Sequence, residues 1–137
     1  MVRSDVVHMR LAKIEEYLAI LGSMRTHSRD TFLRDPEKYG SAERFLQLAI
    51  ECLTDLGNHV IADLQLGTVD ASSDIPRILT EKGYLSSSLC DIWIRMIGFR
   101  NILVHDYLDV DRETVYDVLQ NHLTDIGALS REFRRFL

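Results

Sequence analysis

The stretch from residue 41 to residue 66, S-A-E-R-F-L-Q-L-A-I-E-C-L-T-D-L-G-N-H-V-I-A-D-L-Q-L, is the longest uninterrupted helical pattern in the chain. Its apolar residues recur every three or four positions and form one stripe, which Leu46, Leu53 and Ile61 widen. A stripe this wide predicts a helix that packs among several neighbours. The stripe itself consists of Phe45, Ala49, Cys52, Leu56, Val60 and Leu64.

The segments on either side of this helix also show helical spacing. Asp35-Pro36 interrupts the pattern, because the residue before a proline avoids the α region, and Gly40 and Ser41 mark the predicted start of the long helix. No segment alternates as a strand would. We therefore expect an all-α fold in one domain over residues 1–137, an up-and-down bundle of four main helices plus one or two short helices. The other helices are predicted at 4–26, in a turn or two within 29–40, at 76–82, from 86–88 past Gly98, and from 111 to the C-terminus.

Composition and charge restrict the class of protein. The formal net charge of −5 argues against a broad, non-specific nucleic-acid binder, but a small local basic site for RNA is compatible with it. Cys52 and Cys90 stand alone inside apolar helical patterns, so we read them as buried hydrophobic residues in a reducing compartment. The N-terminus lacks an apolar signal region, and no run reaches the 18 or so apolar residues of a membrane span. A cytoplasmic protein without a membrane segment is expected.

Residues 98 to 107, G-F-R-N-I-L-V-H-D-Y, hold the one close cluster of chemically versatile side chains, at the end of an apolar helix. On a regular helix Arg100 and His105 would point about 140° apart and lie ~7.5 Å apart along the axis. Asn101 and His105, four residues apart, would share a face. Two arrangements would unite the cluster: the helix loosens before His105, or two copies of the chain share a site. An extended backbone from His105 to Tyr107 would point these two side chains the same way.

Several chemistries have no sequence support. The chain contains no phosphate-binding glycine loop, dinucleotide motif or H-E-x-x-H zinc motif, so we expect no cofactor and no metal ligands.

Arg100 offers a permanently charged fork for phosphate, and His105 exchanges a proton near neutral pH. This pair is a minimal set for metal-free RNA cleavage by the 2′-hydroxyl group. The alternative is structural, since arginine, asparagine and histidine all suit a helix C-terminus. His59 is read as a partly buried histidine at a helix contact, with a supporting role at a functional site or dimer seam left open.

The stretch R-N-I-L-V-H-D-Y resembles the R-x4-H-x-Y signature of HepT-like toxins, a branch of the HEPN superfamily. The resemblance covers nearly the whole chain from about residue 5. It rests further on segments that follow one another in the order of that family: E-R-F-L-Q-L-A-I-E at 43–51, D-L-G-N-H at 55–59, I-P-R-I-L at 75–79 and Y-L-D-V-D at 107–111.

This resemblance implies a HEPN-type bundle that forms a homodimer, with both motifs in a cleft at the interface. It implies the toxin of a type VII toxin–antitoxin module, a metal-independent ribonuclease acting on tRNA or mRNA. Arg100 and His105 match the catalytic residues, and Asn101 matches the supporting polar residue. Tyr107 matches the tyrosine to which a cognate MntA-like nucleotidyltransferase antitoxin adds AMP, which silences the toxin. The alternative is a non-catalytic HEPN subunit that binds a nucleotidyltransferase or a nucleotide.

Overall fold

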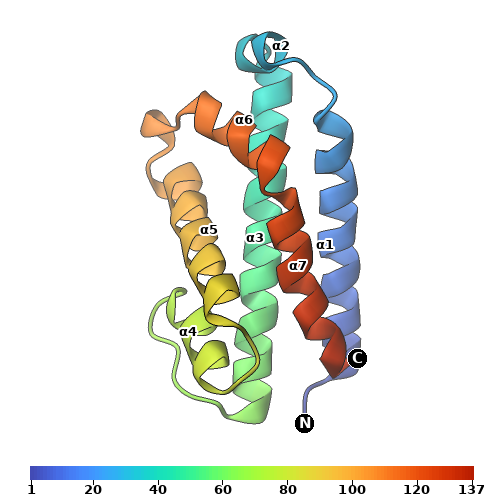
Figure 1. The fold of residues 1–137 in the computed structure, drawn as a ribbon, viewed down its shortest axis with the longest axis vertical. Coiled ribbons are helices and arrows are strands. Elements are labelled where there is room, and N and C mark those ends of the chain that lie inside the picture. The colour runs from blue at the N-terminus through green and yellow to red at the C-terminus, as the bar shows by residue number, and fades with distance from the viewer.

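The computed structural model describes residues 1–137 and contains α- and 3-10 helices without any strand, so the predicted all-α class is confirmed. The four long arms of the bundle run alternately up and down, and both termini lie at the same end (Figure 1). Along the chain the elements are α1 (Ser4–Met24), α2 (Arg29–Arg34), α3 (Pro36–Leu64), α4 (Asp74–Glu81), α5 (Ser87–His105), η1 (Tyr107–Asp109), α6 (Arg112–Asn121), α7 (Leu123–Glu132) and η2 (Phe133–Phe136).

Helix α3 is the centre of the bundle and contacts every other α-helix. It begins at Pro36, five residues before the predicted start at Ser41, and Gly40 lies inside it. Asp35 is its N-cap and accepts a hydrogen bond from the Glu37 amide at 3.0 Å, while proline is well tolerated at the first helical position. The predicted break at Asp35-Pro36 is thus confirmed, but the glycine that follows does not interrupt the helix.

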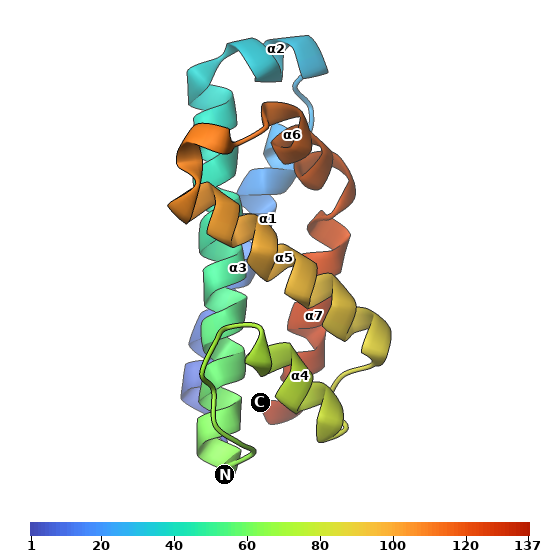
Figure 2. The ribbon, with the colours of Figure 1, turned by 90° about the vertical axis from the view of Figure 1, so that its left-hand side faces the viewer.

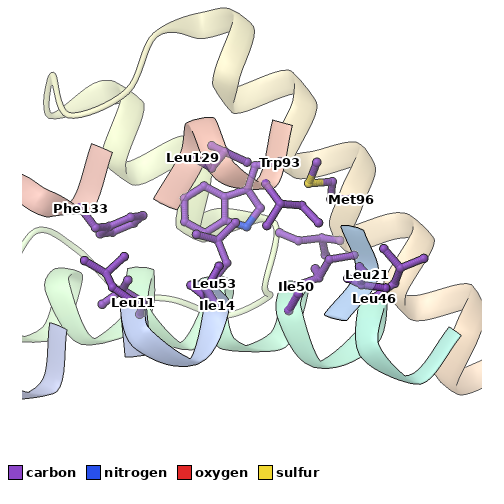
Figure 3. Close-up of a cluster of buried hydrophobic side chains, with 14 of the residues drawn as sticks. Leu11, Ile14, Leu21, Leu46, Ile50, Leu53, Trp93, Met96, Leu129 and Phe133 are labelled. Atoms are coloured by element: carbon purple, nitrogen blue, oxygen red, sulfur yellow. The ribbon is translucent and has the colours of Figure 1, made fainter. Parts of the chain in front are cut away.

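The core is one continuous cluster of 25 buried residues contributed by all the long helices. Trp93 of α5 is fully buried near its middle, among side chains that include Leu53 and Leu129 (Figure 3). Its indole N–H donates to the Thr54 hydroxyl at 3.3 Å, and its ring meets Phe133 edge-on at 5.9 Å between centroids. Burial on this scale fixes the position of α5 against α3 and the C-terminal segment.

The C-terminal arm is divided into two helices, where the sequence predicted one. The division falls at His122, which has φ −120° and ψ 3° and ends α6. Its imidazole lies 3.4 Å from Asp117 of α6 and 3.0 Å from Asp125 of α7, so one side chain joins both helices at the bend. The break could not be predicted from the sequence, because the apolar spacing continues through it.

Helix α5 crosses α3 obliquely, and no other helix lies over its outer side (Figure 2). Gly98 and Asn101 are exposed on this helix, and Ile102 remains 43% exposed although it is a large apolar residue. The uncovered side of α5 therefore presents both polar and apolar groups near its C-terminal end. None of the helices combines the length and the apolar character needed to cross a membrane.

Candidate functional site

Arg100 lies near the C-terminal end of α5 and turns inward against α3. Its guanidinium donates to one carboxylate oxygen of Glu51, Oε1, from Nε at 2.9 Å and from Nη2 at 2.6 Å. Gln47, one turn earlier on α3, donates to the same oxygen at 3.0 Å. About a third or less of each charged side chain is exposed, 28% for Arg100 and 33% for Glu51, so this ion pair is shielded better than most surface pairs.

The charge on Glu51 is stabilised by its neighbours. Partial burial acts to raise the pKa of the Glu51 carboxyl, but hydrogen bonds from Gln47 and Arg100, with the charge of Arg100, outweigh it and hold the pKa below its usual value. Glu51 is therefore ionised at neutral pH and accepts both guanidinium N–H groups as a carboxylate. Arg100 is permanently charged, which makes the pair a stable feature near neutral pH.

Asn101 adjoins the same guanidinium. Its side-chain oxygen accepts a hydrogen bond from Arg100 Nη1 at 3.2 Å. Both residues line a groove of about 420 Å³ between α3, α5 and the loop that precedes α4. Its lining combines buried apolar residues, such as Ile50 and Ile97, with polar ones, such as Asp55, Asn58 and Ser72.

The loop wall of this groove is held by Asp74, the first residue of α4. Its carboxylate accepts the backbone N–H groups of Asp70 at 3.1 Å and Ala71 at 3.0 Å. Hydrogen bonds from Ala71 and Asp70 hold the pKa of Asp74 below its usual value, so the carboxylate keeps this shape at neutral pH. The groove beside Arg100 thus has a defined wall on the side of the loop.

His105 is the last residue of α5, and the helix remains regular up to it. The amide of Asp106 donates to the Ile102 carbonyl at 3.1 Å, an ordinary helical hydrogen bond. The possibility that the helix loosens before His105 is therefore wrong for this chain. On a regular helix the side chains of Arg100 and His105 diverge by about 140°. Within one chain the structure brings Arg100 and Asn101 together and leaves His105 exposed on another side.

Tyr107 follows in the short 3-10 helix η1. Asp106 has φ −116° and ψ 39°, so the backbone between His105 and Tyr107 is not extended, and the arrangement that would point both side chains the same way does not occur. Tyr107 is 69% exposed and the next residue, Leu108, is 86% exposed. Both lie just past the end of α5 and are accessible to another molecule.

Polar residues away from the end of α5 also have structural partners. His59 is partly buried at a helix contact, with Nδ1 3.4 Å from Arg3 and Nε2 3.8 Å from Asp55, as the simpler interpretation predicted. Asp55 also pairs with Arg10 of α1. Arg135 pairs with Glu132 at 2.8 Å near the C-terminus. No group of three or more His, Cys, Asp or Glu side chains is arranged to hold a metal ion.

Glu51 is the member of the site that sequence reasoning missed. It lies 49 positions from Arg100 in the chain, so no local spacing connects the two. The available signal was modest: Gln47 and Glu51 place two polar groups four residues apart beside the apolar stripe of α3, where their side chains meet.

Comparison with known proteins gives one consistent result. A family model described as "Ribonuclease HepT-like" matches residues 14–133. The mRNA nuclease HepT of Shewanella oneidensis is 36% identical over 126 residues, which cover 89% of this chain and 91% of that protein. The tRNA nuclease HepT of Aphanizomenon flos-aquae is 26% identical over 132 residues, covering 96% and 90% respectively. A solved structure of a tri-AMPylated Shewanella oneidensis HEPN toxin in complex with MNT antitoxin superposes with a TM-score of 0.89 at 27% identity, covering 96% of this chain and 98% of that one.

Proposed function

This chain belongs to the ribonuclease HepT-like family, and we propose that it is the toxin of a two-gene toxin–antitoxin module and stops growth by cleaving RNA. The family predicted from the sequence, and the ribonuclease class that goes with it, are thereby confirmed. Its relatives bear the names mRNA nuclease and tRNA nuclease, so either class of RNA is a candidate substrate. One continuous core supports a single HepT-like domain over residues 1–137.

In the proposed mechanism, which needs no metal ion, His105 transfers protons and Arg100 binds the phosphate. The RNA 2′-hydroxyl loses its proton and attacks the adjacent phosphorus, the bond from that phosphorus to the 5′-oxygen of the next nucleotide breaks, and a 2′,3′-cyclic phosphate and a 5′-hydroxyl result. His105 removes the proton from the 2′-hydroxyl or delivers one to the leaving 5′-oxygen. Arg100 binds the phosphate and stabilises the charge that develops on its oxygens in the transition state. Asn101, in contact with the guanidinium, helps to orient it.

We propose that the complete site is shared by two copies of the chain. The regular end of α5 directs Arg100 and His105 to different sides, so one copy does not supply both groups to one phosphate. No other helix covers the outer side of α5. In the proposed homodimer these sides meet in a crossing that brings the arginine of one copy to the histidine of the other. Gly98 is open on this helix, with nothing within 4 Å of the position of a Cβ atom, and it would allow close approach there.

Tyr107 is the proposed point of control. Its phenol is exposed two residues after His105 in the chain, so a nucleotidyltransferase of the MntA type could reach it and attach AMP. The added phosphates would introduce negative charge next to the site that must accept an RNA phosphate. The related toxin described as tri-AMPylated and bound to MNT antitoxin supports this assignment.

The proposal depends most on the position of Arg100. Its guanidinium pairs with Glu51 without using all of its N–H donors, and it lines an open groove. A growth assay tests it. Induction of the wild-type chain should arrest growth, and co-expression of the neighbouring nucleotidyltransferase should relieve the arrest. Arg100→Ala and His105→Ala should each remove the toxicity, because each removes one half of the chemistry, while size-exclusion chromatography should still show the wild-type dimer.

The second candidate, a non-catalytic subunit that binds a nucleotidyltransferase or a nucleotide, predicts a different outcome. Induction would then leave growth unchanged although the chain still formed a complex with its partner. If the wild type arrests growth and both Arg100→Ala and His105→Ala arrest it equally well, the assigned site is contradicted.

A further inference from the structure

The contact between Arg100 and Glu51 uses one particular edge of the guanidinium. Arginine has five N–H donors. Nε and one N–H of Nη2 donate to Glu51, and one N–H of Nη1 donates to Asn101, which engages three of the five. One N–H on Nη1 and one on Nη2 remain without a partner. Two N–H groups of this kind are what a phosphate needs for a bidentate contact.

The carboxylate that holds this edge is itself fixed. Glu51 lies in the middle of α3, the best-packed helix of the bundle, and Gln47 donates to the same oxygen that receives Arg100. Helices α3 and α5 are packed side by side through the core around Trp93 (Figure 1). An arginine side chain has four rotatable bonds, so its guanidinium is precisely placed only when neighbours restrain it.

We propose that Glu51 is a positioning residue for the ribonuclease reaction, which orients the Arg100 guanidinium from α3 so that its two free N–H groups meet the scissile phosphate. This inference rests on the proposed function, since it takes Arg100 as the group that binds phosphate. The carboxylate acts through the arginine and does not itself touch RNA.

The same contact has an opposite reading, in which Glu51 competes with RNA for the arginine. The geometry favours positioning, because the carboxylate occupies only the Nε and Nη2 edge and leaves donors free for a second anion. Competition predicts that loss of the carboxylate raises activity, whereas positioning predicts that it lowers activity. The direction of the change therefore separates the two.

The test is steady-state cleavage of a defined RNA by the purified full-length protein with Glu51→Gln. This change keeps the size of the side chain and removes its charge. Because displacement of a transition-state group by about 1 Å can cost 100-fold, we expect kcat to fall by about 10- to 100-fold while KM changes by less than about threefold. Glu43→Gln is the matched control: it removes the same charge from a partly buried position on α3 that makes no contact with Arg100, and it should leave kcat unchanged.

A second comparison separates positioning from a general structural effect. In an Arg100→Ala background, Glu51→Gln should lower the residual rate no further, because a residue that acts through Arg100 has nothing left to orient. If Glu51→Gln does not fold, Gln47→Ala carries the test: it withdraws the amide that holds Glu51, and kcat should fall with little change in KM.

Each outcome bears on one claim. A wild-type or higher kcat in folded Glu51→Gln, or in Gln47→Ala where that variant is needed, overturns the positioning role, as does a full additional loss in the Arg100→Ala background. If the wild-type chain cleaves no RNA, or if Arg100→Ala cleaves it at the wild-type rate, the proposed function itself fails. An inactive Arg100→Ala with a fully active Glu51→Gln rejects the positioning role alone.

Discussion

Gly57 shows how a single missing side chain sets the distance between helices. It is buried on α3, opposite α4 and α5. A Cβ atom placed there would lie 2.6 Å from Cγ2 of Ile75 and 2.8 Å from Cη2 of Trp93. Both neighbours are themselves buried, so neither can easily withdraw. Only glycine permits this approach, which brings Ile75 of α4 against α3 in the lining of the groove beside Arg100.

Gly57→Ala is therefore expected to destabilise the protein. Overpacking in a core typically costs about 1–3 kcal/mol, which exceeds the gain of about 1 kcal/mol from replacing glycine in a helix. The melting temperature should fall by several degrees in thermal unfolding followed by circular dichroism. Gly40→Ala on the same helix is the control, because nothing lies within 4 Å of its Cβ position, and it should raise the melting temperature slightly. A Gly57→Ala protein at least as stable as the wild type would contradict this view of the contact.

At this scale the sequence identifies groups by their chemistry but not by their partners. Arg100, Asn101, His105 and Tyr107 could be selected because versatile side chains recur at close spacing in one short segment. The Glu51 carboxylate could not, because its role depends on the packing of α3 against α5. The same limit applies to Gly57, whose requirement for glycine is visible only once Ile75 and Trp93 are in place.

At the scale of elements, apolar periodicity predicts which segments are helices and fails at some of their ends. The start of α3 at Pro36 depends on the cap formed by Asp35, which overrides the unfavourable Gly40 inside the helix. The bend at His122 depends on contacts with Asp117 and Asp125 on both sides of it. The end of α5 matters most for the proposed site, because the helix stays regular through His105 and then turns directly into η1.

The accessible phenol on η1 leads to a prediction about control. Tyr107 is the most exposed tyrosine of the chain, and it follows the proposed site in the sequence. Incubation with the neighbour-encoded nucleotidyltransferase and ATP should add the mass of one or more AMP units, measured by intact-protein mass spectrometry, and should reduce RNA cleavage. Tyr107→Phe should prevent the increase because it lacks the accepting oxygen. A mass increase that persists in Tyr107→Phe would show that the modification occurs elsewhere.

At the scale of the whole molecule, the bundle itself was predictable and the assembly of the site was not. Wide apolar stripes and short connections lead directly to an up-and-down helical bundle, which the structure confirms. Helical geometry already separated Arg100 from His105, but two arrangements remained until the regular end of α5 excluded one of them. An acidic chain with a net charge of −5 is compatible with the proposed RNA substrate, because the proposal concentrates phosphate binding at Arg100.

A site shared by two copies of the chain predicts that two inactive variants can restore activity to each other, which a site within one chain does not predict. Suppose that Arg100→Ala and His105→Ala chains are co-expressed and form dimers at random. About half of the dimers are mixed, and each mixed dimer recovers one of its two sites, because an intact arginine faces an intact histidine. About a quarter of the wild-type activity should return, although either variant alone is inactive.

The most direct test is therefore RNA cleavage in the presence of EDTA by the wild type, by each variant alone and by the co-expressed pair. The wild type should cleave with EDTA present, and loss of a general acid–base group in His105→Ala should reduce the rate by about 100- to 10,000-fold. The co-expressed pair should regain about a quarter of the wild-type rate. Cleavage by His105→Ala at the wild-type rate, or a mixed pair as inactive as its parents, would contradict a metal-independent site shared by Arg100 and His105 of two chains.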